Sequence, residues 1–239
     1  MKIEVLADSG AVAERAAAVI ADYAWDAIAS RGSFVMAVSG GHTPWIMLRW
    51  LAAAHLPWRA IHVVQVDERV APAGHPDRNL THINESLLAN APLPPDQLYA
   101  MPVESPDLEE AAERYAAALR TIAGEHPIID LVHLGLGPDG HTASLVPGDP
   151  VLDVDDADVA VSGPYQGRRR MTLTYPILNR ARHILWVVTG GEKVGMVNRL
   201  LNGDRGIPAG RVDRDRALLL ADSAAAGRPA SKIGGVVCV

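Results

Sequence analysis

The chain has 239 residues, of which 49% are hydrophobic and 21% charged, and its formal net charge is −6. This composition is typical of a globular protein with a sizeable core. A net negative charge gives no overall field that would attract nucleic acid or an anionic membrane, so we expect neither as a partner. An anionic ligand would have to be bound by a few local donors.

Cysteine usage and the first residues indicate a cytoplasmic protein. The one cysteine, Cys238, has no partner for an intramolecular disulfide and no neighbours for a zinc cluster of cysteines. Residues 1–8 lack the cationic start and the long apolar stretch of a signal peptide. No run reaches the roughly 18 apolar residues that indicate a membrane span.

Short β-branched segments alternate with segments of helical periodicity along the chain. In residues 11–30 apolar side chains recur every three to four positions, which is typical of a helix with one buried face. In chain order we predict strands at 3–6, 33–39, 61–66, 128–134, 158–162, 170–174, 183–189, 217–221 and 235–239. We predict helices at 11–30, 43–54, 79–90, 107–123 and 192–201.

This alternation predicts an α/β fold, in which residues 1–239 form a single domain with a doubly wound, mostly parallel sheet and helices on both faces. In such open sheets, ligands bind beyond the carboxyl ends of the strands. Residues 39–44, 67–69 and 135–144 each follow a predicted strand directly. We therefore expect these segments to meet at one edge of the sheet.

The segment Gly135-Leu-Gly-Pro-Asp-Gly-His-Thr-Ala-Ser144 places a histidine in a glycine-rich loop. Gly135, Gly137 and Gly140 allow backbone conformations that a Cβ would hinder, and they let a ligand approach closely. Histidine side chains exchange protons near neutral pH, so His141 is a candidate general acid or base. The alternative is a turn in which His141 only caps a helix or bonds to the backbone.

The segment Ser39-Gly-Gly-His-Thr-Pro44 leads from a predicted strand into a predicted helix. Pro44 suits the first position of a helix, and Thr43 suits its N-cap. Gly40 and Gly41 would expose backbone N–H groups at the positive end of the helix, where an anion binds favourably. The segment lacks the Gly-Lys-Ser/Thr ending of a nucleotide-binding P-loop. The alternative is a tight turn that binds nothing.

Charged residues at three further places could contact a ligand. Asp67, Glu68 and Arg69 follow a buried strand and form either part of a site or a structural ion-pair cluster. Arg69 could stabilise an oxyanion, and Asp67 could orient a histidine or bind a ligand hydroxyl. Arg170 and Lys193 could each bind a phosphate, unless they are ordinary solvated charges.

Taken together, these segments resemble the 6-phosphogluconolactonase family. The matching pieces, in the family's order, are Ser39–Pro44, Asp67–Arg69 with Pro72, Arg78-Asn79, Gly135–Gly148, Arg170–Thr174 and Lys193. Each motif is short, but six in register span most of the chain. Two positions depart from the pattern: Arg78 stands where the family usually has serine, and Gly210 stands where it often has serine.

The resemblance implies a Rossmann-like fold shared with glucosamine-6-phosphate deaminases and ribose-5-phosphate isomerases. It also implies hydrolysis of 6-phospho-D-glucono-1,5-lactone to 6-phosphogluconate in the pentose phosphate pathway. The small-molecule partner would then be a sugar-phosphate lactone, with no metal and no organic cofactor. We expect a monomer or a small homo-oligomer.

The resemblance also implies roles for individual residues. His141 would be the general base, oriented by Asp67 or Asp139, and Arg69 would be a donor to the oxyanion. The phosphate would be held by Gly40, Gly41, Thr43, Arg170 and Lys193. The full set of implied substrate-binding residues is Ser39, Gly40, Gly41, Thr43, Glu68, Asn79, Gly140, Arg170 and Lys193.

Two other functions are compatible with the residues. On the same fold, a sugar-phosphate deaminase or isomerase would use Asp67 to move a proton between carbons. The residues that follow His141, Thr142-Ala-Ser144, and the pattern Arg170–Thr174 favour the lactonase over that alternative. A non-catalytic sugar-phosphate sensor would normally carry a DNA-binding module, for which we expect no spare length in the chain.

Overall fold

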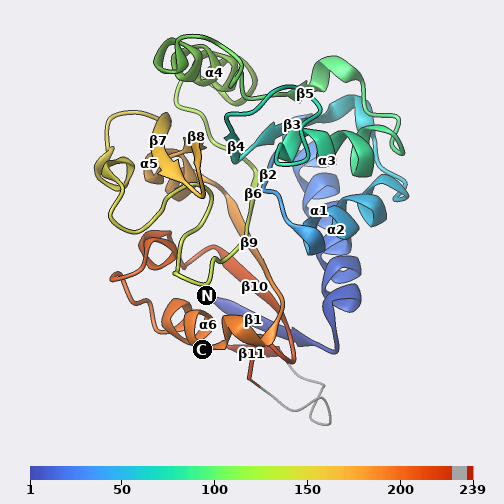
Figure 1. The fold of residues 1–239 in the computed structure, drawn as a ribbon. Helices are drawn as coiled ribbons and strands as arrows, with labels where there is room; N and C mark the ends of the chain where they lie inside the picture. Colours follow the sequence, from blue (N-terminus) through green and yellow to red (C-terminus); the bar gives the residue numbers. More distant parts are fainter. Residues whose placement is uncertain (228–235, 239) are drawn as a thin grey trace.

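The structure, a computed structural model, describes residues 1–227 and 236–238. An eight-stranded sheet forms the centre of this part of the chain (Figure 1). The strand order is β11-β1-β10-β9-β6-β2-β3-β5, and neighbours are parallel except β11, which runs antiparallel to β1. The strands are β1 (Lys2–Leu6), β2 (Phe34–Val38), β3 (Ile61–Gln65), β5 (Leu98–Tyr99), β6 (Leu131–Leu134), β9 (His183–Val188), β10 (Ala217–Asp222) and β11 (Val236–Cys238). The prediction of a mostly parallel sheet is confirmed.

The sheet is buried on both faces because its strands are apolar at consecutive positions. Along β2, Phe34, Met36 and Val38 belong to one core, and Val35 and Ala37 belong to the other. Successive side chains of a strand point to opposite faces, so one apolar run supplies both cores. The predicted cover of helices on both faces is confirmed.

Each core is closed by its own set of helices (Figure 1). The core that contains Phe34 packs against α1 (Ser9–Arg31), α2 (His42–Ala52) and α3 (Asn79–Ile83). The opposite core packs against α4 (Leu108–Ala123), α5 (Tyr175–Arg180) and α6 (Val194–Leu201). Short 3-10 turns connect the elements at Trp58–Ala60, Pro95–Gln97, Pro150–Asp153, Gly191–Lys193 and Pro208–Arg211.

Two of the long helices begin at aspartates that cap them. The Asp8 carboxylate accepts the N–H of Ala11 at 2.9 Å at the start of α1, and Asp107 accepts the N–H of Glu110 at 2.9 Å before α4. Such a contact satisfies a backbone donor that has no partner within the helix. At the other end of α1, Gly32 adopts a left-handed conformation that terminates the helix.

A second, three-stranded antiparallel sheet contains β4 (Asp67–Arg69), β8 (Arg168–Leu173) and β7 (Val159–Tyr165), in that order. The strands predicted at 158–162 and 170–174 lie here and not in the central sheet. Val66 joins the two sheets, because its N–H bonds to Val38 and its carbonyl accepts the N–H of Leu173 at 2.8 Å. Through this link β3 continues into β4.

The helix predicted at 79–90 is wrong in its second half. Regular α-helix ends at Ile83, and Asn84–Leu88 forms a π-helical turn in which the N–H of Ala89 reaches the carbonyl of Asn84 at 2.9 Å. The Ser86 hydroxyl donates to the carbonyl of His82 within this turn. A hydroxyl that competes for backbone carbonyls in this way disfavours a regular helix interior.

The structure also differs from the prediction at several short elements. β5 and α5 were not predicted, because segments of 2 and 6 residues are too short to show a periodicity. The strand predicted at 235–239 is present as β11 at Val236–Cys238, and residues 235 and 239 lie outside the described residues.

The direction of the chain connections reverses between β2 and β6. From β2 the chain crosses to β3, which is the neighbour on the side away from β6. From β6 it proceeds to β9, the neighbour on the other side. In open parallel sheets a crevice forms where the connections diverge in this way. The loops that follow β2 and β6 therefore border the expected ligand site.

We predict that Gly210→Ser destabilises the protein by about 1–3 kcal/mol, which is the usual cost of overpacking. A Cβ at Gly210 would overlap the backbone carbonyl of Asp204, so the chain must shift to admit serine. Chemical unfolding measures the change in the free energy of unfolding. Gly195→Ser is the control, because no atom lies within 4 Å of a Cβ there. Equal unfolding midpoints for the two variants would contradict this account.

Candidate active site

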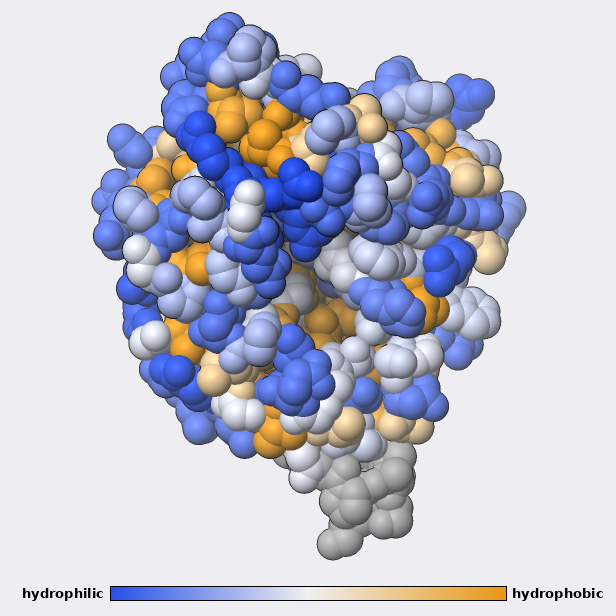
Figure 2. Space-filling view, viewed as in Figure 1, coloured by the Kyte–Doolittle hydropathy of each residue, from blue (hydrophilic) through white to orange (hydrophobic). Residues whose placement is uncertain are grey.

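A cavity of about 220 Å³ lies beyond the carboxyl ends of β2, β3 and β6. Its polar lining comes from the three segments that the sequence pointed to and from the more distant Asn79, Arg170 and Lys193. Figure 2 shows this face of the molecule as mostly hydrophilic, with a hollow near its centre. The full lining comprises Ser39, Gly40, Gly41, Asp67, Arg69, Asn79, Gly135, Leu136, Gly137, Pro138, His141, Ala143, Arg170 and Lys193.

His141 is held by Asp139, two residues before it. The Asp139 carboxylate lies 2.5 Å from Nδ1 of the ring and also accepts the backbone N–H of His141 at 3.1 Å. Burial by itself raises the pKa of Asp139, but the hydrogen bonds from His141 outweigh it and bring the pKa below its usual range. A carboxylate only accepts hydrogen bonds, so the proton of a neutral His141 ring lies on Nδ1. The lone pair of Nε2 is then free for chemistry.

The glycines of this loop make room for the histidine. A Cβ at Gly137 would overlap the His141 ring. Gly140 has a φ of 84°, and a Cβ there would lie 2.7 Å from the side chain of Ile207. The Gly137 N–H also bonds to the carbonyl of His141 at 2.8 Å and closes the turn. The loop can therefore place His141 at the cavity only with glycine at these positions.

Asp67 is a buried carboxylate in the wall of the cavity, with 5% of its surface exposed. It accepts the Ser144 hydroxyl at 2.7 Å, and Asn79 donates its side-chain N–H to the Asp67 carbonyl at 2.9 Å. Burial raises the pKa of the Asp67 carboxyl, whereas the Ser144 hydroxyl and the Arg69 guanidinium oppose this rise. Asp67 contacts these groups and not His141.

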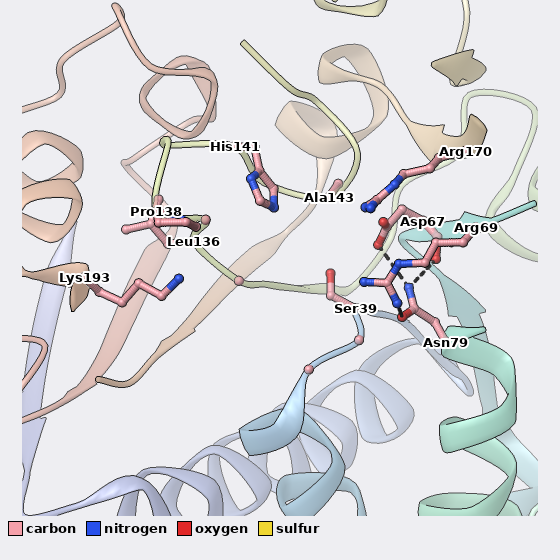
Figure 3. A pocket seen from close by; sticks show the side chains of 14 residues that line it. Ser39, Asp67, Arg69, Asn79, Leu136, Pro138, His141, Ala143, Arg170 and Lys193 are labelled. Atoms are coloured by element: carbon pink, nitrogen blue, oxygen red, sulfur yellow. Dashed lines mark hydrogen bonds between the residues drawn. The ribbon is translucent and has the colours of Figure 1, made fainter. Parts of the chain in front are cut away.

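In Figure 3 the Asp67 carboxylate lies between the side chain of Arg170, above it, and that of Arg69, below it. The two arginines come from paired positions of β4 and β8. Arg69 donates to the carbonyl of Asp77 at 2.7 Å and to the side chain of Asn79 at 3.3 Å. Arg170 is 3% exposed, and its Nε has no hydrogen-bond partner among the described residues. A buried guanidinium with an unused donor at a cavity is suited to an oxygen-rich ligand.

The loop after β2 brings a helix N-terminus to the cavity. Ser39 is bound to β6, since its N–H and hydroxyl bond to His133 at 3.2 and 3.1 Å. Helix α2 then begins at His42 with Gly41 as its N-cap and no side-chain cap. The assignment of Thr43 as N-cap is therefore wrong. Gly41, with a φ of 132°, already ends the loop, and the Thr43 hydroxyl bonds instead to Thr189 at 2.8 Å.

Lys193 reaches the cavity from the opposite side. It ends the 3-10 turn Gly191–Lys193, directly before α6, and forms no ion pair within the described residues. In Figure 3, His141 lies between Lys193 on one side and Arg170 with Arg69 on the other. The cations therefore form two groups at two ends of the cavity rather than a single clamp.

Glu68 points away from the cavity and belongs to the protein core. It is fully buried and accepts the N–H groups of Arg69, Asn79 and Leu80, each at 2.8 Å. Its charge is paired with the buried Arg78, whose Nε lies 3.1 Å from the carboxylate. Arg78, the first departure from the family pattern, thus neutralises a buried acid. These contacts fix β4 to the start of α3.

The structure brings most of the sequence-predicted residues to one cavity. Those at the wall are Ser39, Gly40, Gly41, Asp67, Arg69, Asn79, His141, Arg170 and Lys193. Four do not line the cavity: Glu68 and Asp139 bond to lining residues, Gly140 directly precedes one, and Thr43 bonds to Thr189. Sequence reasoning missed Ser144 and Tyr165 as partners of the two acids. Ser144 stands in the same glycine-rich motif, whereas no motif marked Tyr165.

Within residues 1–227 and 236–238, no His, Cys, Asp and Glu side chains gather in groups of three or more that could hold a metal ion. No helix in these residues combines the length and apolar character that crossing a bilayer requires.

A histidine–aspartate pair and two groups of cations at the switch point of a parallel sheet define an α/β enzyme with a cavity suited to an anionic ligand. The chain belongs to the glucosamine-6-phosphate isomerase/6-phosphogluconolactonase family, which matches residues 7–220. It is similar to the 6-phosphogluconolactonase of Synechocystis sp., with 39% identity over 80% of this chain and 81% of the relative.

Solved structures agree with this family. A 6-phosphogluconolactonase from Thermotoga maritima has a TM-score of 0.82 and 27% identity, covering 92% of this chain and 98% of that one. A monomeric glucosamine-6-phosphate deaminase has a TM-score of 0.83 at 20% identity, covering 96% of this chain and 100% of that one. The deaminase shares the fold, and at this identity the likeness extends no further.

We predict that Arg78→Ala costs about 3–5 kcal/mol in the free energy of unfolding, because it leaves Glu68 as an unpaired buried charge. Chemical denaturation of the folded protein measures the loss. Arg169→Ala is the control, because Arg169 forms an exposed ion pair with Glu109 and such pairs contribute little. A loss for Arg78→Ala no larger than the control would show that Glu68 does not need this partner.

Proposed function

We propose that this chain hydrolyses 6-phospho-D-glucono-1,5-lactone to 6-phosphogluconate, the second step of the oxidative pentose phosphate pathway. The observation that carries the proposal is the Asp139–His141 pair, whose free Nε2 belongs to a cavity lined by cations. The names of the Synechocystis and Thermotoga relatives support the same activity. No metal and no organic cofactor is part of this proposal.

In the proposed reaction His141 acts as general base. Nε2 takes a proton from water as the water oxygen attacks the lactone carbonyl, while Asp139 stabilises the imidazolium through Nδ1. The carbonyl oxygen becomes an oxyanion in the tetrahedral intermediate. When the bond to the ring oxygen breaks, His141 returns its proton to that oxygen. The new carboxylic acid releases its proton to solvent at neutral pH.

The two groups of cations suit the two ends of this substrate. We assign the phosphate to Lys193 and to the N–H groups of Gly40 and Gly41 at the uncapped start of α2. Arg69 and Arg170, on the other side of His141, are then donors to the lactone oxygens. This arrangement separates Arg170 from Lys193, which the sequence had grouped together as phosphate ligands. Thr43 supports the phosphate end through Thr189.

We propose a cytoplasmic enzyme that forms a single domain and works as a monomer or a small homo-oligomer. The single cysteine, Cys238, is consistent with a reducing compartment.

Asp67 gives the deaminase or isomerase alternative its specific support. Its carboxyl lines the cavity and burial raises its pKa, which suits a group that moves a proton between carbons. Ammonia release from glucosamine 6-phosphate, measured beside lactone hydrolysis, separates the two reactions. Ammonia release without lactonase activity would replace our proposal by this alternative.

We predict that His141→Ala lowers kcat by about 10²–10⁴-fold, the usual contribution of a general base. Lactone hydrolysis is followed by coupling to 6-phosphogluconate dehydrogenase, and the uncatalysed rate is subtracted. His126→Ala is the matched control, because His126 lies outside the lining of this cavity. Near-full activity of His141→Ala would rule out the proposed base, and lactone binding without turnover by the unmodified protein would favour a sensor.

We predict that Lys193→Ala lowers kcat/KM for the phosphorylated lactone by about 10- to 100-fold, as expected for the loss of a charge-assisted contact. The variant should leave hydrolysis of the dephosphorylated lactone nearly unchanged. Arg170→Lys should weaken turnover of both lactones, because Arg170 faces the lactone end in our assignment. The opposite pattern would place the phosphate at Arg170.

A further inference from the structure

Tyr165 lies where the hairpin of β7 and β8 reaches the candidate active site. Gln166 and Gly167 connect the strands with φ values of 52° and 78°, which are typical of a two-residue type I′ turn. The register between the strands shifts between Ser162 and Tyr165, which marks a β-bulge. The carboxylate of Asp149 holds this bulge by accepting the N–H of Gly163 at 2.8 Å. A bulge redirects the side chain that follows it.

The redirected Tyr165 side chain makes three contacts, one through its hydroxyl and two through its ring. The hydroxyl donates to the free carboxylate oxygen of Asp139, Oδ2, at 3.1 Å. The ring packs edge-on against His141, with the two ring centroids 5.2 Å apart. The guanidinium of Arg170 lies over the ring face, 4.9 Å from its centroid, and also donates to the Tyr165 carbonyl at 3.4 Å.

We infer that Tyr165 is a positioning residue that holds the Asp139–His141 pair and Arg170 in a fixed relation to each other. It does not line the cavity, so it acts through these neighbours and not on the substrate. The inference deepens the proposed lactonase, because it rests on His141 as base and on Arg170 at the lactone end.

The hydroxyl and the ring have separable effects. Asp139 uses Oδ1 for His141, and the Tyr165 hydroxyl occupies Oδ2, so the carboxylate cannot rotate away from the imidazole. A base that is held in its productive orientation increases the rate of the chemical step. The ring face instead fixes Arg170 by a cation–π contact, which affects how the lactone is bound.

Tyr165→Phe tests the hydroxyl alone, because it keeps both ring contacts. We expect kcat to fall about 10-fold with KM within a factor of two, in the range for losing a hydrogen bond to a charged group. Tyr165→Ala should lower kcat similarly and also raise KM by about 3- to 10-fold as Arg170 loses its support. Tyr99→Phe is the matched control, since that hydroxyl bonds to His62 at the edge of the sheet.

A double-mutant cycle shows whether the hydroxyl acts through Asp139. In an Asp139→Asn background, Tyr165→Phe should have little further effect on kcat, because the acceptor that it orients is gone. If the kcat losses of Asp139→Asn and Tyr165→Phe multiply in the double variant, the inference is overturned. Unchanged kcat in Tyr165→Phe alone would overturn it too. Thermal melts of all variants confirm that the comparison is made between folded proteins.

NMR of the free protein separates this inference from the proposed function. The Nδ1–H proton of His141 should exchange with solvent about 10-fold faster in Tyr165→Phe than in the unmodified protein or Tyr99→Phe. Absence of lactonase activity in the unmodified protein would reject the function, whereas unchanged exchange would reject the role of Tyr165. The two failures are therefore distinguishable.

Discussion

The divergence of the chain connections that leave β2 and β6 is the constraint on which the site depends. Because the connections diverge there, neither strand's following helix closes the space beyond the strand ends. Ser39 joins the two strand ends through its bonds to His133. Burial lowers the pKa of His133 to about 4, so at neutral pH its ring is uncharged and Nδ1 stays an acceptor for the Ser39 N–H. The hydrogen bond that joins the two strand ends therefore does not change with protonation in the physiological range.

The side-chain alternation of β4 explains how three adjacent charged residues serve two purposes. Successive side chains of a strand point to opposite faces, so Asp67 and Arg69 face the cavity and Glu68 faces the core. The buried acid on the core side has its own cation, Arg78. The cavity side combines Asp67 with Arg69 and Arg170, so its local charge is positive even though the chain is acidic overall.

Periodicity was sufficient to predict the α/β class, the parallel sheet and the three segments at its carboxyl edge, because all of these depend on local pattern. It could not distinguish the two interpretations of Asp67–Arg69, because the prediction ended the preceding strand at Val66 and so gave no alternation for the charges. The sequence pattern also could not show whether Asp67 or Asp139 holds His141. The structure places Asp139 on the ring, while Asp67 bonds to Ser144 through a contact 77 residues apart in sequence. No sequence pattern indicated Tyr165, because its position depends on a β-bulge that Asp149 holds.

The groups around the cavity differ in how firmly they are held, and the difference matches the steps of the proposed reaction. The His141 loop is fixed by its own turn and by the bond from the Ala209 N–H to the Gly140 carbonyl at 3.0 Å. A general base gains most from such preorganisation, because the rate depends steeply on its alignment. Lys193 instead reaches the cavity on a flexible four-carbon chain, which costs little precision because a phosphate accepts a point charge from many directions. In our proposal, rigid parts of the fold therefore carry the proton transfer, and an adaptable side chain binds the distant phosphate.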